Sequence, residues 1–89
     1  MTNSPSLTDI PAALPLLESD VLKTFVGIAE SGSFTRTAAQ VFRTTAAVSQ
    51  QIKRLEESLG RTLFLRESRR VRLTADGEIL LGYARRLLK

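Results

Sequence analysis

The chain contains no cysteine, no histidine and no tryptophan. Without cysteine and histidine it has no disulfide bond, no zinc site built from these residues and no thiol nucleophile, and it lacks the commonest general base. No apolar run approaches the roughly 20 residues that a membrane-spanning helix needs. The proline-broken stretch "IPAALPLL" is not preceded by the Lys or Arg of a secretory signal. We therefore expect no metal, no cofactor and no membrane partner.

The length and composition describe one small domain. The 89 residues have a hydrophobic fraction of 43% and a charged fraction of 25%, close to globular averages. A chain of this size removes only about 60–65% of its unfolded surface from water, so the core must be compact.

Basic residues are concentrated in the second half. Residues 43–89 hold eleven basic and five acidic side chains, whereas residues 1–42 hold two basic and four acidic ones. The net charge is +4 and the isoelectric point is about 10.4. Nucleic acid is the leading candidate partner, because neutralised phosphates release counterions and so supply affinity. The alternative is a solvated basic face that only maintains solubility.

Helical periodicity begins after a proline-containing leader. Residues 1–16 hold all three prolines and no sustained period, and we expect a flexible leader there. From Ser19 to Ser31 the apolar residues fall on one broad helical face, and Gly32 is placed to end that helix. Ser33 then caps a short second helix, in which apolar or small residues recur at helical spacing: Phe34, Thr37, Ala38 and Val41.

A third helix is predicted from Thr45 to Leu59. Thr44 is its N-cap, and Gly60 can take the left-handed conformation that ends a helix. Its buried stripe has spacings of four, three and four residues: Val48, Ile52, Leu55 and Leu59. The connection "FRT" is too short to separate this helix from the second, so the pair forms a helix-turn-helix.

The segment after Gly60 predicts a basic hairpin and a last helix. Val71 and Leu73 alternate with Arg70 and Arg72 as in a half-buried strand, and the hairpin tip is expected at Glu67-Ser68-Arg69. Thr74 caps a helix that runs through Lys89. The predicted fold is mainly α, a winged helix-turn-helix with a three-helix core and a two-stranded β wing over residues 17–74, followed by a helix over residues 75–89.

One face of the third helix carries the candidate contact residues. Opposite Val48 and Ile52, a helical wheel places a face that is small, polar and weakly basic as a whole, with Thr45 in the exposed first turn: Ala46, Ser49, Gln50, Lys53 and Glu57. A helix that enters a major groove needs short residues where backbone and bases come close, and Gln can offer the paired donor and acceptor that adenine accepts. The alternative is a polar helix face that touches nothing.

The hairpin would add contacts to the DNA backbone. Arginines in the wing are available for phosphates or for a narrow minor groove. These wing arginines are Arg69, Arg70 and Arg72. We expect further phosphate contacts from Lys53, Arg54 and Arg66, and the alternative for each of these three is an idle surface charge.

The apolar residues of the last helix are too many to lie on one narrow face of it. One flank can pack on the domain while the other is covered by a partner, and a paired helix would hold two recognition helices about one DNA turn apart. The predicted dimer interface consists of Leu80, Tyr83, Ala84, Leu87 and Leu88. Alternatively, the exposed flank contacts a segment that this chain lacks.

Catalytic arrangements are poorly supported. Glu56 and Glu57 are adjacent and point about 100° apart on a helix, which does not suit paired acid/base chemistry. Ser49 has no histidine partner, and the glycines form no phosphate-binding loop. We expect no enzymatic activity.

Three stretches resemble the LysR-type transcriptional regulators of bacteria: "LKTFVGIAESGSFTRTA", "AAVSQQIKRLEESLGRTLFLR" and "RRVRLTADGEILLGYARRLL". The resemblance implies a winged helix-turn-helix and a linker helix that pairs two subunits on double-stranded DNA. It also implies an effector domain, absent from this chain, through which a small molecule would act, and a cytoplasmic, nucleoid-associated protein.

The resemblance assigns roles by position. It implies base contacts from Thr45, Ala46, Ser49 and Gln50, and backbone contacts from Ser33, Thr35, Thr44, Lys53 and the wing arginines. Thr44 and Thr45 stand where the family usually has Ser-Gln, and Ala46 stands where it usually has Pro. A Thr in place of Gln removes a bidentate contact and supplies a methyl group that favours thymine, so base preference cannot be transferred.

The predicted function is therefore a sequence-specific DNA-binding domain that binds an inverted repeat as a dimer. The rival is a winged helix that binds another protein and whose basic charge is incidental. Phosphate binding weakens steeply as salt rises, whereas an apolar interface hardly responds.

Overall fold

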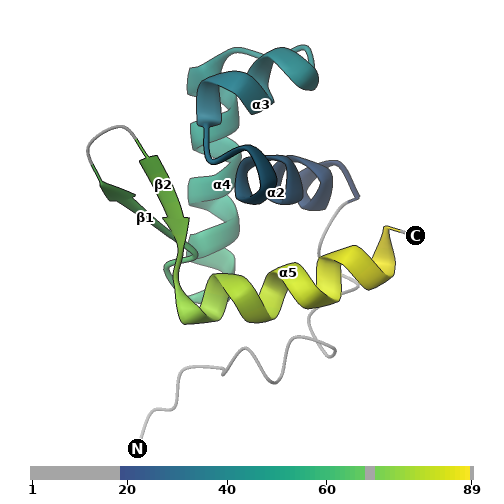
Figure 1. Cartoon of the computed structure of the whole chain (residues 1–89), viewed down its shortest axis with the longest axis vertical. Helices are drawn as coiled ribbons and strands as arrows, with labels where there is room; N and C mark the ends of the chain where they lie inside the picture. Colours follow the sequence, from purple (N-terminus) through teal and green to yellow (C-terminus); the bar gives the residue numbers. More distant parts are fainter. Residues whose placement is uncertain (1–18, 68–69, 89) are drawn as a thin grey trace, which may run out of the picture.

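The computed structural model describes residues 19–67 and 70–88 (Figure 1). The helices α2 (Ser19–Ser31), α3 (Phe34–Gln40) and α4 (Thr45–Leu59) precede the strands β1 (Phe64–Glu67) and β2 (Arg70–Leu73), and α5 (Ala75–Leu87) follows. The predicted bounds of the first and third helices are confirmed. The last helix ends at Leu87, with Leu88 as its C-cap, rather than at Lys89. The leader, the hairpin tip at positions 68–69 and Lys89 lie outside the described residues.

Side-chain caps explain where the helices begin. The hydroxyls of Ser33, Thr44 and Thr74 each accept the backbone N–H three residues later at 3.0 Å, as the sequence predicts. Gly60 ends α4 with a φ of 64°, a conformation that favours glycine. These signals are local, because each cap involves residues only three or four positions apart.

The core is a set of apolar stripes from all four described helices and the base of the hairpin. The predicted stripe of α4 is buried along its whole length. The rings of Phe25 and Phe34 lie 5.3 and 5.8 Å from that of Phe64, which joins α2, α3 and β1. The other buried apolar residues are Leu22, Ile28, Ala38, Leu63, Leu80 and Ala84.

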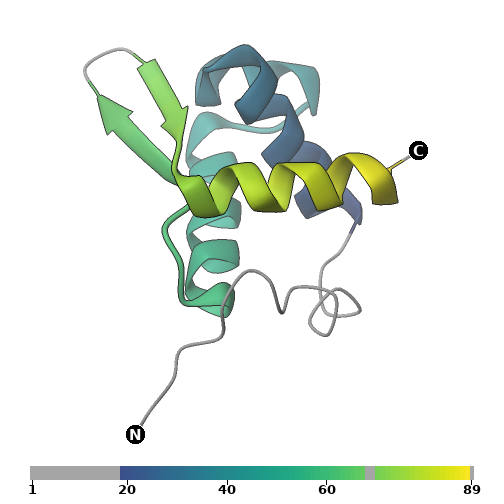
Figure 2. The ribbon, with the colours of Figure 1, turned by 60° about the horizontal axis from the view of Figure 1, so that its bottom comes forward.

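The hairpin and α5 complete the arrangement. β1 and β2 pair antiparallel, with Phe64 opposite Leu73 and Glu67 opposite Arg70. The hairpin points toward the end of the molecule where α3 and the start of α4 lie, and α5 lies at the other end (Figure 1). Figure 2 shows α5 crossing the molecule from the base of the hairpin, and it packs on α2 and β2. This is a winged helix-turn-helix, as predicted.

Candidate nucleic-acid interface

The outer face of α4 carries the predicted base-contacting residues. Thr45, Ala46 and Gln50 are exposed and Ser49 is half-buried, whereas Val48 on the opposite side is fully buried. Lys53 and Arg54 continue the exposed surface along the next turn. The face is therefore open to a ligand, with short side chains at its amino-terminal end and positive charge behind them.

Two capping hydroxyls lie at helix ends near this face. Thr44 accepts the N–H of Ala47, and Ser33 accepts the N–H of Arg36. A hydroxyl that accepts a backbone N–H retains its own hydrogen for donation. Thr44 and Ser33 therefore combine a structural role with the capacity to donate to a phosphate, and Thr35 is exposed in the first turn of α3.

A hydrogen-bond network positions the amino-terminal end of α3. The Oγ of Ser31 lies 3.1 Å from the Oγ1 of Thr37, and it accepts the backbone N–H of Ser33 at 3.2 Å. Thr37 is fully buried and Ser31 is half-buried, so the network is partly shielded from water. Ser33 is thus held in place by residues on both sides of the turn.

The hairpin presents its arginines in different settings. The guanidinium of Arg66 lies 4.2 Å from the ring centre of Phe34, the first residue of α3, in a cation–π contact. Arg72 forms an exposed ion pair with Glu67 at 3.9 Å. Arg70 is exposed, and Arg69 lies outside the described residues. Arg66 is consequently the wing arginine whose position packing defines best.

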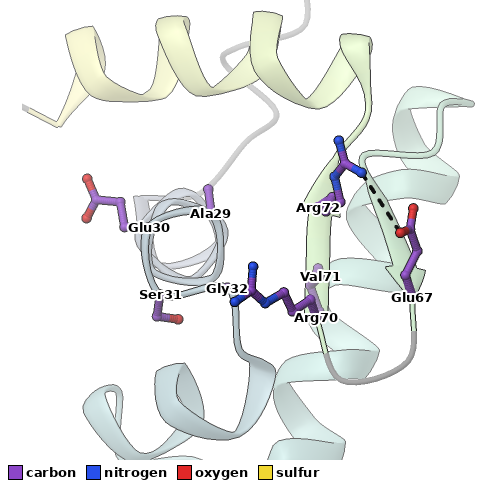
Figure 3. Close-up of a pocket in the computed structure, with 8 residues that line it drawn as sticks. All are labelled: Ala29, Glu30, Ser31, Gly32, Glu67, Arg70, Val71 and Arg72. Carbon is purple, nitrogen blue, oxygen red and sulfur yellow. Dashed lines mark ion pairs between the residues drawn. The ribbon is translucent and has the colours of Figure 1, made fainter.

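An open groove of about 860 Å³ separates the hairpin from the carboxyl end of α2 (Figure 3). Arg70, Val71 and Arg72 line its wing side, and Arg70 extends toward the turn at Gly32. Charged groups of both signs line this groove, since Glu30 and Glu67 also border it. Arg70 therefore lies beside α2 as well as on the wing.

Three exposed residues of the helix-turn-helix were not among the predicted contact residues: Arg36, Phe42 and Arg43. Arg43 precedes α4, and Arg36 lies in α3; both are exposed. Phe42 is 94% exposed and has a φ of 58°, which is unusual for a non-glycine residue. The sequence does not show whether an isolated arginine such as Arg36 or Arg43 faces DNA, because its position depends on how α3 and α4 pack against each other.

The predicted partner face of α5 needs correction. Leu80 and Ala84 are fully buried in the core of the domain, so they do not lie on a surface that a partner could cover. The exposed apolar flank instead includes Ile79, which is 40% exposed, and Leu87, which is 49% exposed. Tyr83 and Leu88 are half-buried. The buried side of α5 is formed by Gly77, Leu80 and Ala84. Because the helix has apolar residues on several sides, its periodicity alone could not show which side faces the core.

Within residues 19–67 and 70–88, no three acidic, Cys or His side chains converge to hold a metal ion. Among the described helices, none is both long and apolar enough to cross a membrane. The arrangement presents hydroxyls, an amide and cationic groups, which suit hydrogen bonding to a polyanion.

These features define the class as a winged helix-turn-helix protein, and comparisons with known proteins specify its family. A family model described as "Bacterial regulatory helix-turn-helix protein, lysR family" matches residues 19–78. The chain belongs to this family, as the sequence motifs predicted.

Named relatives include the HTH-type transcriptional regulator PecT of Dickeya dadantii, 47% identical over 73 residues, and DgdR of Burkholderia cepacia, 51% identical over 73 residues. In each case the match covers 82% of this chain, but only 23% of PecT and 25% of DgdR. The chain thus spans about a quarter of the length of these relatives.

Solved structures share the fold. The complex of the BenM DNA-binding domain with catB site 1 DNA has a TM-score of 0.77 at 39% identity, over 81% of this chain and 80% of that one. The CbnR DNA-binding domain in complex with DNA has a TM-score of 0.77 at 35% identity, over 81% and 83%. The fold of this chain therefore matches those of two domains that were solved in complex with DNA.

Proposed function

We propose that this chain is a sequence-specific DNA-binding domain of a transcriptional regulator, with α4 as the recognition helix in the major groove. The observation that carries the proposal is the exposed face of small polar residues at the amino-terminal half of α4, opposite a fully buried Val48. The BenM and CbnR domains were solved in complex with DNA, which supports the same role here.

The proposed base contacts come from the first turns of α4. Gln50 offers a donor and an acceptor to one base, and Thr45 offers a methyl group and a hydroxyl. Ala46 and Ser49 allow close approach of the helix backbone. The proposed backbone contacts are made by Ser33, Thr35, Thr44, Lys53, Arg54, Arg66, Arg69, Arg70 and Arg72.

We propose that two copies bind an inverted repeat through paired α5 helices. The exposed flank of α5, with Ile79 and Leu87, supports this arrangement, because apolar surface of this kind is usually covered by a partner. In the complete regulator, an effector domain would add small-molecule control in the bacterial cytoplasm, at the nucleoid.

The direct test is selection of bound duplexes from a random-sequence pool at near-physiological salt, followed by titration of the selected duplex and a scrambled one across salt. We expect an enriched palindrome that is preferred over the scrambled sequence, with affinity that falls as salt rises. Absence of enrichment would contradict specific recognition. Salt-independent binding to a protein instead of DNA would favour the rival interpretation.

Substitution of Gln50 locates the recognition surface. Gln50→Ala should cost about 1–3 kcal/mol on the selected duplex and relax discrimination at one base pair, because a bidentate contact is lost. Gln40→Ala, at an exposed position at the end of α3, is the matched control and should leave affinity unchanged. Equal losses on selected and scrambled DNA would exclude Gln50 as a base contact.

A further inference from the structure

Glu56 joins the recognition helix to the base of the wing. It lies in the last turns of α4 and is half-buried. Its Oε2 accepts the backbone N–H of Leu63 at 2.7 Å and that of Phe64 at 3.3 Å. Its backbone carbonyl also accepts the N–H of Arg61 at 3.2 Å. Glu56 thereby accepts hydrogen bonds from three backbone N–H groups in the segment that leads into β1.

The two amides that the carboxylate binds belong to buried residues. Leu63 is fully buried and Phe64 is 5% exposed. A buried backbone N–H without a partner is costly, and a hydrogen bond to a carboxylate is stronger than one to a neutral group. Loss of the carboxylate would therefore leave two amides at the base of the wing to find other partners, by movement of the segment or by entry of water.

A small tilt at the base of the wing produces a larger displacement at its far end. β1 is four residues long, so its far end at Glu67 is three residues beyond Phe64 and lies about 10 Å from it, at about 3.3 Å per residue. A tilt of about 10° at the base would shift that end by about 2 Å, from the same length. Charge-assisted hydrogen bonds have a narrow range of about 2.7–2.9 Å, so such a shift would break contacts from arginines on the wing.

We propose that Glu56 is a positioning residue that sets the angle between the recognition helix and the wing, and thereby determines how much the wing arginines contribute to DNA binding. The proposal rests on the function proposed above, since the wing needs a polyanion to act on. Glu56 itself does not contact DNA in this arrangement, because its carboxylate is engaged with the backbone of the wing.

Two substitutions separate the reach of the side chain from its charge. Glu56→Asp keeps the charge but withdraws the carboxylate by one methylene, so the contacts with Leu63 and Phe64 are lost. Glu56→Gln removes the charge but keeps an acceptor oxygen at the same reach. Matched controls are Glu78→Asp and Glu78→Gln, at an exposed position in the first turn of α5 that is not part of the proposed DNA contacts. Thermal melts of every variant establish that it is folded before binding is measured.

On the selected duplex, Glu56→Asp should flatten the plot of log affinity against log salt by about one to two units, which corresponds to the loss of one or two phosphate contacts. In this background Arg70→Ala should cause little further change, whereas in the parent chain it should lower the slope by about one unit. Glu56→Gln should retain the parent slope, as should both Glu78 variants. A role in folding alone would lower the melting temperature and leave these slopes unchanged.

A second measurement needs no DNA. Because the chain has no cysteine, spin labels can be attached specifically at Ala47→Cys on α4 and Glu67→Cys on β1. We expect a narrow distance distribution in the parent chain and in Glu56→Gln, and a broader or shifted one in Glu56→Asp. An unchanged distribution or an unchanged salt slope in Glu56→Asp would overturn the proposal. Failure of the parent chain to bind any duplex would refute the proposed function alone, and the label distances would then still decide whether Glu56 positions the wing.

Discussion

Substitution by alanine should change the stability of the domain in opposite directions at Gly77 and Gly82, which lie five positions apart on α5. At Gly77 a Cβ atom would collide with the backbone carbonyl oxygen of Leu63 and would lie 2.7 Å from a Cδ2 atom of Leu73. At Gly82 a Cβ atom would have no neighbour within 4 Å. The two positions therefore differ in packing while sharing the same helix and the same substitution.

The expected magnitudes follow from these surroundings. Overpacking costs about 1–3 kcal/mol, and the gain in helix propensity of up to about 1 kcal/mol offsets it only in part at Gly77. We expect Gly77→Ala to destabilise the domain by about 1–2 kcal/mol, because a carbonyl cannot rotate away as a side-chain end can. Gly82→Ala should stabilise it by about 0.5–1 kcal/mol.

Thermal unfolding followed by far-ultraviolet circular dichroism measures the difference. For a domain of this size, 1 kcal/mol corresponds to a shift in Tm of about 4–8 °C, so a difference of about 1.5–3 kcal/mol should separate the two variants by about 6–24 °C. A Gly77→Ala chain as stable as Gly82→Ala would refute the close approach of α5 to Leu63. Urea unfolding at constant temperature provides an independent value of the free energy.

Three further predictions address the wing, the partner face and the end of α4. Arg70→Ala should weaken binding to all duplexes alike and lower the salt slope by about one unit, and an unchanged slope would remove Arg70 from the phosphate contacts. Leu87→Glu should give monomers in sedimentation and abolish cooperative binding to two half-sites, whereas surviving dimers would place the interface elsewhere. Gly60→Ala should lower the free energy of unfolding by about 1 kcal/mol, because its backbone is left-handed and no atom crowds a new Cβ. Urea unfolding would reveal a stability equal to the parent if that conformation were unimportant.

Local signals in the sequence were sufficient to predict the helices and the recognition face. Capping by Ser33, Thr44 and Thr74 depends on residues only three apart, and the buried stripe of α4 follows from a single period. The exposure of Gln50 follows from the same period, because it lies opposite that stripe.

Contacts between distant segments could not be predicted in this way. Arg85 pairs with Glu30 at 3.3 Å across 55 positions, and Arg66 lies over the ring of Phe34 across 32 positions. The inward orientation of Leu80 and Ala84 likewise depends on how α5 crosses α2, since the helix has apolar residues on several sides. Glu56 appeared in the sequence only as a poor catalytic candidate, because its partners are backbone amides that carry no side-chain signature.

The short connection before β1 joins the elements that would bind DNA to the helix that would bind a partner. The carboxylate of Glu56 on α4 holds the N–H groups of Leu63 and Phe64. From the other side, the N–H of Thr74 donates to the carbonyl of Leu63 at 2.9 Å, and its hydroxyl donates to the carbonyl of Thr62 at 2.7 Å. Thr74 is also the N-cap of α5. Because the same few backbone groups anchor α4, the wing and α5, we expect a change in the direction of α5 to move the wing as well. These hydrogen bonds would thereby link the proposed pairing of α5 to the proposed DNA contacts of the wing.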